Sequence, residues 1–109
     1  MAKGSMGGNN LGNLMKQAQK MQMEMQKAQE ELEASVFEAQ SGGGVVKVVF
    51  NGKKQMQSIT ILPEAVDPDD VEMLEDLVIA AVNQAMENIE ETTKEKVGRL
   101  TGGMKIPGF

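Results

Sequence analysis

Four residue types are missing from this sequence of 109 residues. It contains no cysteine, which excludes disulfides and thiolate chemistry, and no histidine, tryptophan or tyrosine. Histidine is the commonest general base and the commonest metal ligand in proteins. We therefore expect a non-enzymatic protein with no catalytic residues, metal, cofactor or small-molecule substrate.

Long apolar runs are also missing. A transmembrane helix needs about 20 predominantly apolar residues, whereas the apolar runs here are only a few residues long. The first ten residues carry one lysine and no apolar segment typical of a signal peptide. We therefore expect a cytoplasmic protein that does not use the membrane as a partner, and the length suits one domain.

The net charge of −5 is unevenly placed along the chain. Residues 1–29 carry four lysines against Glu24, a local net charge of +3, and residues 41–63 carry three lysines and no acid. Residues 64–100 carry eleven acids against three cations, a local net charge of −8. Such segregation is more informative than the total charge, because it predicts basic and acidic surfaces on different elements.

The stretch from Gly42 to Pro63 predicts a β-hairpin, with its two strands within residues 45–62. Residues 45–50 are nearly all β-branched or aromatic, and residues 55–62 form the return strand. Asn51-Gly52 between them is a strong hairpin signal, since a type I′ turn needs positive φ at both central residues.

The hairpin has one apolar face and one mixed face. The apolar face contains Val46, Val48, Phe50, Ile59 and Ile61, whereas the other contains Val45, Lys47, Val49, Met56, Ser58 and Thr60. An isolated hairpin is marginally stable in water, so we expect helices to cover the apolar face. The preceding segment, residues 35–40, predicts a short extra strand that would complete a three-stranded antiparallel meander.

Helical periodicity appears on both sides of the hairpin. From about Leu11 to Leu32, apolar residues recur at steps of three and four, forming a seam of Leu11, Leu14, Ala18, Met21, Met25, Ala28 and Leu32. A second helix should follow Asp67-Pro68-Asp69-Asp70, with Asp67 as N-cap and Pro68 at the first helical position, and end near Leu100. Its broad apolar face should consist of Val71, Leu74, Leu77, Val78, Ala81, Val82, Ala85, Met86 and Ile89.

These elements predict an α+β fold of helix, three-stranded antiparallel sheet and helix. We expect residues 11–100 to form a single domain, residues 1–10 a flexible N-terminus and residues 101–109 a flexible C-terminal tail. One short sheet cannot cover both apolar helix faces, and the edge strand of the hairpin is left unpaired. The sequence therefore predicts a homodimer that covers these surfaces.

Two groups of cations are candidate phosphate-binding residues. Lys16, Lys20 and Lys27 fall within about 40° of one another on the first helix, opposite its apolar seam. Lys94, Lys96 and Arg99 lie near the end of the second helix, where cations also offset the helix dipole. For both groups, a simple solvated face stays open as the alternative interpretation.

Two other motifs have more ordinary explanations. The acids Glu64, Asp67, Asp69, Asp70, Glu72, Glu75 and Asp76 are better explained as anions at a helix N-terminus than as a cation site, since glycine is missing where an EF-hand loop needs it. Gly42-Gly43-Gly44 predicts a turn, because neither the lysine nor the helix of a phosphate-binding loop follows.

Three segments together carry a family resemblance: LMKQAQKMQMEMQKAQEEL, GGGVVKVVFNG and MLEDLVIAAVNQAMENIEETTKEKVGRLTGGMKIPGF. In this combination the chain resembles the YbaB/EbfC family of bacterial nucleoid-associated proteins, from about Leu11 to Phe109. The resemblance implies a tweezer-like homodimer that binds duplex DNA on the nucleoid with little sequence specificity. It also implies that the DNA-binding residues are Lys16, Lys20, Lys27, Lys94, Lys96 and Arg99.

We therefore expect a non-enzymatic, nucleoid-associated protein that binds DNA mainly through phosphate contacts. The alternative class is a protein-interaction module such as a prefoldin-like chaperone, which also uses the order helix, hairpin, helix. The first helix is short for a chaperone tentacle, and a gel shift with DNA beside a client-aggregation assay would separate the two classes.

Overall fold

The computed structural model describes residues 2–100, with side chains from Asn10 onward. It confirms the α+β order of helix, three-stranded antiparallel sheet and helix. The elements are α1 (Ala2–Ala34), β1 (Val36–Ser41), β2 (Val46–Asn51), β3 (Met56–Ile61), the 3₁₀ turn η1 (Pro63–Ala65) and α2 (Val71–Leu100). Helix α1 begins at Ala2 instead of near Leu11. Flexibility of residues 1–10 in solution stays a prediction, and residues 101–109 lie outside the described part.

The sheet is a meander in which β2 is the central strand. The extra strand predicted before the hairpin is confirmed as β1, whose Ser41 pairs with Val46 and whose Phe37 pairs with Phe50. The loop between β1 and β2 holds three glycines with positive φ, at 60°, 74° and 99° for Gly42, Gly43 and Gly44. Because residues with a side chain rarely adopt positive φ, the three glycines allow the turn that the sequence predicted here.

The second loop differs from the predicted type I′ turn. Lys54 is the residue with positive φ, at 65°, and Gly52 is not in that region. The Lys54 N–H donates to Asn51 O at 3.1 Å, and the Asn51 N–H donates to Gln55 O at 3.0 Å. A tight turn followed by one left-handed residue is the usual three-residue hairpin loop. The Asn51 carboxamide stabilises it by accepting from the N–H groups of Lys53 and Gln55.

Gly52 is required for a different reason, which is its contact with α1. Its N–H donates to Glu33 O at 3.3 Å, beside the last turn of the helix. A Cβ atom at this position would collide with the backbone of Leu32 and lie 2.9 Å from the Glu33 Cα. The glycine therefore allows the hairpin loop to pack directly on the end of α1.

The predicted division of the hairpin faces is largely correct. Val46 pairs with Ile61 and Val48 with Ile59, so these four side chains share a face. Met56 was expected on the opposite face but pairs with Phe50, because a bulge shifts the register between Val49 and Phe50. An extra residue in one strand reverses the alternation beyond it.

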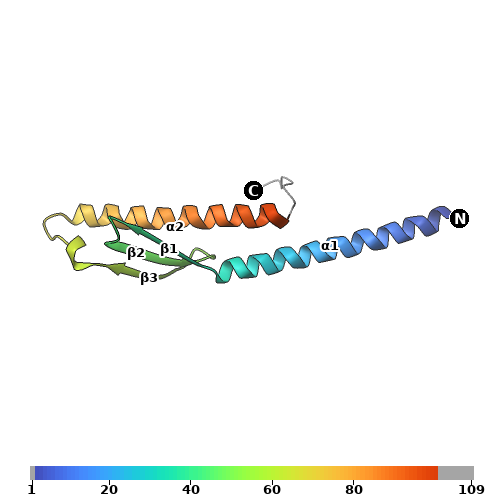
Figure 1. Ribbon diagram of the computed structural model, residues 1–109, viewed down its shortest axis with the longest axis horizontal. Helices are drawn as coiled ribbons and strands as arrows, with labels where there is room; N and C mark the ends of the chain where they lie inside the picture. The colour runs from blue at the N-terminus through green and yellow to red at the C-terminus, as the bar shows by residue number, and fades with distance from the viewer. Residues whose placement is uncertain (1, 101–109) are drawn as a thin grey trace.

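Helix α2 covers one face of the sheet, over β1 and β2 (Figure 1). The buried core consists of Phe37, Ala39, Val46, Val48, Phe50, Ala81, Ala85 and Ile89. The Ser41 hydroxyl fastens the end of β1 to the helix by donating to Leu77 O at 2.6 Å. The apolar face predicted for the second helix is thus confirmed, apart from Val71, which is exposed.

The α2 helix begins at Val71, three residues later than the predicted start at Pro68. The Asp70 carboxylate accepts from the Met73 N–H at 3.2 Å, which makes Asp70 the N-cap in place of Asp67. Asp67 instead stabilises the preceding turn, where its carboxylate accepts from the Asp69 N–H. Competition from this local turn explains the later start of the helix.

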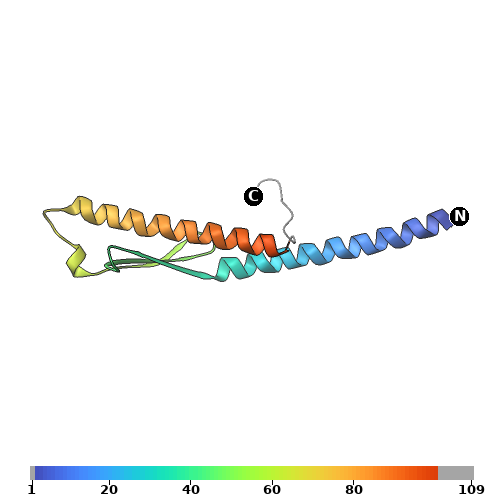
Figure 2. The same ribbon diagram turned by 45° about the horizontal axis from the view of Figure 1, so that its top comes forward.

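Helix α1 leaves the sheet and projects well beyond the end of α2 (Figures 1 and 2). The molecule consequently measures 84 × 21 × 16 Å. Residues 10–24 of α1 are exposed on every side, and partial burial begins at Met25. We call residues 10–24 the arm, since they form a helix without tertiary contacts that would bury it.

Candidate nucleic-acid interface on the projecting helix

The basic face of α1, which runs along the arm and just beyond it, is the strongest candidate site. Lys16, Lys20 and Lys27 border one shallow surface of α1, together with Gln19, Met23 and Glu24. At 1.5 Å per residue the three lysines extend over about 17 Å of helix. Within the part of the chain with described side chains, none of the three has an ion-pair partner within 4 Å. Their ammonium groups are therefore available to an external anion.

Two features moderate this basic surface. Glu24 contributes a carboxylate between the lysines, and Met23 presents a thioether that is 70% exposed. The face therefore carries a net positive charge but is not uniformly basic. Long, exposed lysines suit contacts with a flexible pattern of phosphates better than rigid recognition of one base.

The cations of α2 do not come together as one cluster. Lys96 is 69% buried at its side chain and bridges to the Glu31 carboxylate of α1 at 3.3 Å. Arg99 lies 3.8 Å from Glu95 one turn earlier, with both side chains largely exposed. Lys94 points toward another surface, beside Gly52 and Lys54 of the hairpin loop. A role for each in DNA binding stays a prediction, and Lys96 has a structural role as well.

The proximity of Lys54 to Lys94 was not predicted from the sequence. Both line a surface hollow between the hairpin loop and the two helices, which Glu33 and Glu90 also line. The sequence signal was the cluster of positive charge in residues 41–63, but no local pattern places it beside α2. Because two carboxylates accompany the two lysines, this hollow is a weaker anion site than the arm.

The acidic residues before and within the start of α2 remain dispersed. Among the residues that the structure describes, no three carboxylates lie close enough together to hold a metal ion. Asp67 and Asp70 are used as backbone hydrogen-bond acceptors, as a helix N-terminus requires. Neither helix within residues 2–100 has an apolar segment of the length that crossing a bilayer takes.

The fold and its charges define a class: a small helix–sheet–helix protein whose projecting helix carries exposed lysines on one face. The chain belongs to the YbaB/EbfC DNA-binding family, whose model matches residues 6–104. This is a family of DNA-binding proteins and not of enzymes, in agreement with the missing histidine and cysteine.

Relatives support the assignment over the full length of the chain. The chain is 57% identical to a nucleoid-associated protein of Clostridium novyi, over 94% of this chain and 90% of that one. It is also 57% identical to one of Caldanaerobacter subterraneus, over 100% and 99% of the two chains. The fold is similar to that of an uncharacterized protein from Helicobacter pylori, with a TM-score of 0.68 at 25% identity, over 84% and 92% of the two chains.

Proposed function

We propose that this protein is nucleoid-associated and binds duplex DNA as a homodimer, mainly through phosphate contacts from the lysines on the basic face of α1. The observation that carries the proposal is the set of Lys16, Lys20 and Lys27 on one exposed face, with no ion-pair partner among the described side chains. Their span of about 17 Å corresponds to roughly five base-pair steps along the axis of the duplex, at a rise of 3.4 Å each. Family membership supplies DNA as the polyanion.

Little sequence preference is expected from this surface. The commonest specific contact in the major groove is a bidentate arginine on guanine. The single arginine of the chain is Arg99, which belongs to the end of α2 and not to the arm. Lysines on a flexible stem position a protein on the backbone of DNA without identifying its bases.

An uncovered part of the sheet supports the homodimer. Ile59 and Ile61 are 42% and 36% exposed, although their partners Val48 and Val46 on the same face are 0% exposed. Because α2 lies over β1 and β2, the β3 side of this face stays exposed within residues 2–100. Burying an isoleucine side chain fully contributes about 1.5–3 kcal/mol. A second copy seated on β3 would therefore be stabilised by both isoleucines.

DNA binding is tested by Lys16→Glu with Lys20→Glu, using anisotropy of labelled duplexes over a range of salt. We expect weaker binding to every duplex alike. The slope of log K against the logarithm of the salt concentration should also become shallower, by about 0.9 for each phosphate contact that is lost. Lys94→Glu with Arg99→Glu makes the same change of charge on α2 and serves as the matched variant. If the arm variant stays folded and binds with the slope of the unsubstituted protein, the arm is not the site.

The dimer is tested by sedimentation, which should give twice the chain mass of 11.8 kDa. Ile59→Asp should shift the protein to monomer, since it places a charge in the proposed interface. Thr60→Asp adds the same charge on the opposite face of β3 and should leave the dimer intact. A monomer at micromolar concentration before any substitution would refute this part of the proposal.

The chaperone alternative has one observation in its favour, which is the exposed apolar seam of the arm. Leu11, Leu14 and Met21 are all exposed in one chain. Such residues would suppress aggregation of an unfolded client at high salt, where phosphate contacts are screened. Salt-independent suppression of aggregation, together with no DNA binding at low salt, would favour this alternative.

A further inference from the structure

The outward side of α2 carries exposed carboxylates around one exposed isoleucine. Ile79 is 56% exposed, whereas the helix buries its other side against the sheet. Glu72 and Asp76 precede Ile79 at steps of four and three residues, Asn83 follows four residues later, and all four side chains are exposed. Within the described side chains neither carboxylate has an ion-pair partner. We call these four residues the acidic face of α2.

The basic face of α1 has the same spacing with the opposite charge. Four exposed residues follow one another there at steps of four, three and four: Lys16, Lys20, Met23 and Lys27. This alternation keeps one side of a helix against one partner helix over several turns. Laid parallel, the two faces match cations with carboxylates and one exposed apolar residue with the other: Lys16 with Glu72, Lys20 with Asp76 and Met23 with Ile79.

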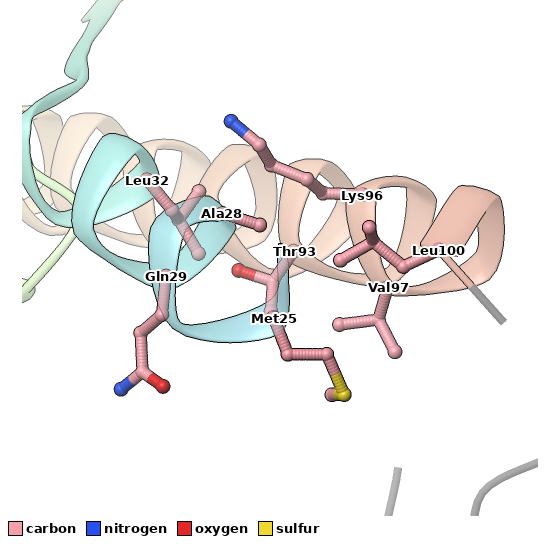
Figure 3. Close-up of a pocket in the computed structure, with 8 residues that line it drawn as sticks. All are labelled: Met25, Ala28, Gln29, Leu32, Thr93, Lys96, Val97 and Leu100. Carbon is pink, nitrogen blue, oxygen red and sulfur yellow. The ribbon is translucent and has the colours of Figure 1, made fainter. Parts of the chain in front are cut away.

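One chain does not bring its own two faces together. Helix α2 meets α1 through the side of α1 that carries Met25, Ala28 and Leu32, which line a small apolar groove beside the last turns of α2 (Figure 3). That side is the apolar seam, opposite the lysines. Glu72 lies in the first turn of α2, about 42 Å along the helix from Leu100. Contact between a basic and an acidic face therefore requires a second copy.

We propose that the basic face of α1 docks on the acidic face of α2 of a second copy, and that duplex DNA displaces it. Exposed ion pairs contribute about 0.2–1 kcal/mol each, so this contact is weak and depends on salt. DNA carries one charge per about 1.7 Å of its axis, whereas Glu72 and Asp76 are about 6 Å apart along α2. The denser polyanion should win the lysines. Only this competition rests on the proposed function, since the contact between copies needs no DNA.

The contact is tested by sedimentation of the full chain without DNA. Because the two faces differ, each chain can engage two neighbours, and the mean mass should rise with protein concentration. The mass at about 0.01 M salt should exceed the mass at about 1 M salt, where charges are screened within about 3 Å. The net charge of −5 by itself would drive copies apart at low salt. Equal masses at both salt concentrations would overturn the proposal.

Charge reversal on either face should abolish this association, and mixing the two variants should restore it. Lys16→Glu with Lys20→Glu keeps the acidic face, whereas Glu72→Lys with Asp76→Lys keeps the basic face. Neither variant should associate alone at low salt, but their mixture pairs one intact face of each kind. Both variants remain net negative, so overall attraction does not explain association of the mixture. No association in the mixture, with both variants folded by circular dichroism, would overturn the proposal.

A matched variant changes the charge of α2 outside the acidic face. Glu90→Lys with Glu91→Lys reverses two exposed carboxylates farther along the helix. This variant should associate alone at low salt as the unsubstituted protein does. Loss of its association would assign the effect to the total charge of α2 and overturn the proposed location.

The facing of Met23 and Ile79 is tested by a disulfide between copies. The chain has no cysteine, so Met23→Cys in one copy and Ile79→Cys in another form a selective pair. Oxidation of the mixture at low salt should link them, as identified by the mass of the joined peptides. Gln84→Cys, exposed on another side of α2, should link to Met23→Cys several-fold less. Equal yields for the two pairs would overturn the proposed facing.

Competition is measured by the yield of the same disulfide. Saturating duplex DNA should lower the yield several-fold, because it occupies the lysines around Met23. An unchanged yield in protein that is bound to DNA by anisotropy would overturn the displacement. Absence of DNA binding would instead refute the proposed function and leave the contact between copies standing.

Discussion

Replacing Gly52 should destabilise the protein through a collision between the hairpin loop and the end of α1. A Cβ atom there overlaps the Leu32 backbone and approaches the Glu33 Cα. Removing this overlap requires the hairpin loop to move away from the end of α1, which breaks the hydrogen bond from the Gly52 N–H to Glu33 O. Overpacking costs about 1–3 kcal/mol, and loss of the hydrogen bond adds about 0.5–1.5 kcal/mol. We therefore expect Gly52→Val to lower the free energy of unfolding by about 1.5–4.5 kcal/mol.

The measurement is urea unfolding at a fixed protein concentration, since the stability of a dimer depends on it. Gly52→Ala should already show most of the loss, because the Cβ atom itself makes the collision. Gly12→Ala is the matched control: a Cβ atom there meets nothing within 4 Å, and alanine should stabilise the helix by about 1 kcal/mol.

A third variant separates the two explanations for the loop. Lys54 holds a φ of 65°, so Lys54→Gly should stabilise the protein by about 1 kcal/mol. A type I′ turn at Asn51-Gly52 would give no such gain. Unchanged stability of both Gly52 variants would refute the steric argument.

Three further predictions concern the capping of α2, the charge of the arm and the anchoring of β1. Asp70→Ala should cost about 0.5–2 kcal/mol in urea unfolding through loss of the bond from the Met73 N–H, whereas Asp70→Asn should retain most of the stability. Glu24→Gln should strengthen DNA binding in the anisotropy assay, since it removes the carboxylate from between the lysines, and weaker binding would contradict a phosphate-contacting face. Ser41→Ala should cost about 0.5–1.5 kcal/mol in thermal unfolding by removing its bond to Leu77 O, and a neutral result would mean that water replaces the hydroxyl.

The sequence predicted the elements well because their signals are local. Alternation of apolar residues identified the core positions Val46, Val48 and Phe50, and spacing by three and four identified Ala81, Ala85 and Ile89 on the second helix. The basic face of the arm was equally accessible, since the angle between residues on one helix follows from their numbers alone. The predicted N-cap of the second helix was wrong, since it lies at Asp70 instead of Asp67.

The tertiary structure alone decided which of these surfaces meet. Gly52 looked like a turn residue, but its necessity comes from Leu32 and Glu33, whose approach no pattern around Asn51-Gly52 reveals. Three cations close together in the sequence near the end of α2 were separated, since Lys96 pairs with Glu31 of α1, Arg99 pairs with Glu95 of α2, and Lys94 lines a hollow beside the hairpin loop. Ile59 was expected in the core, yet α2 is placed over β1 and β2 and leaves it exposed. Periodicity determines which face of an element is apolar, whereas the placement of distant elements determines whether that face is covered.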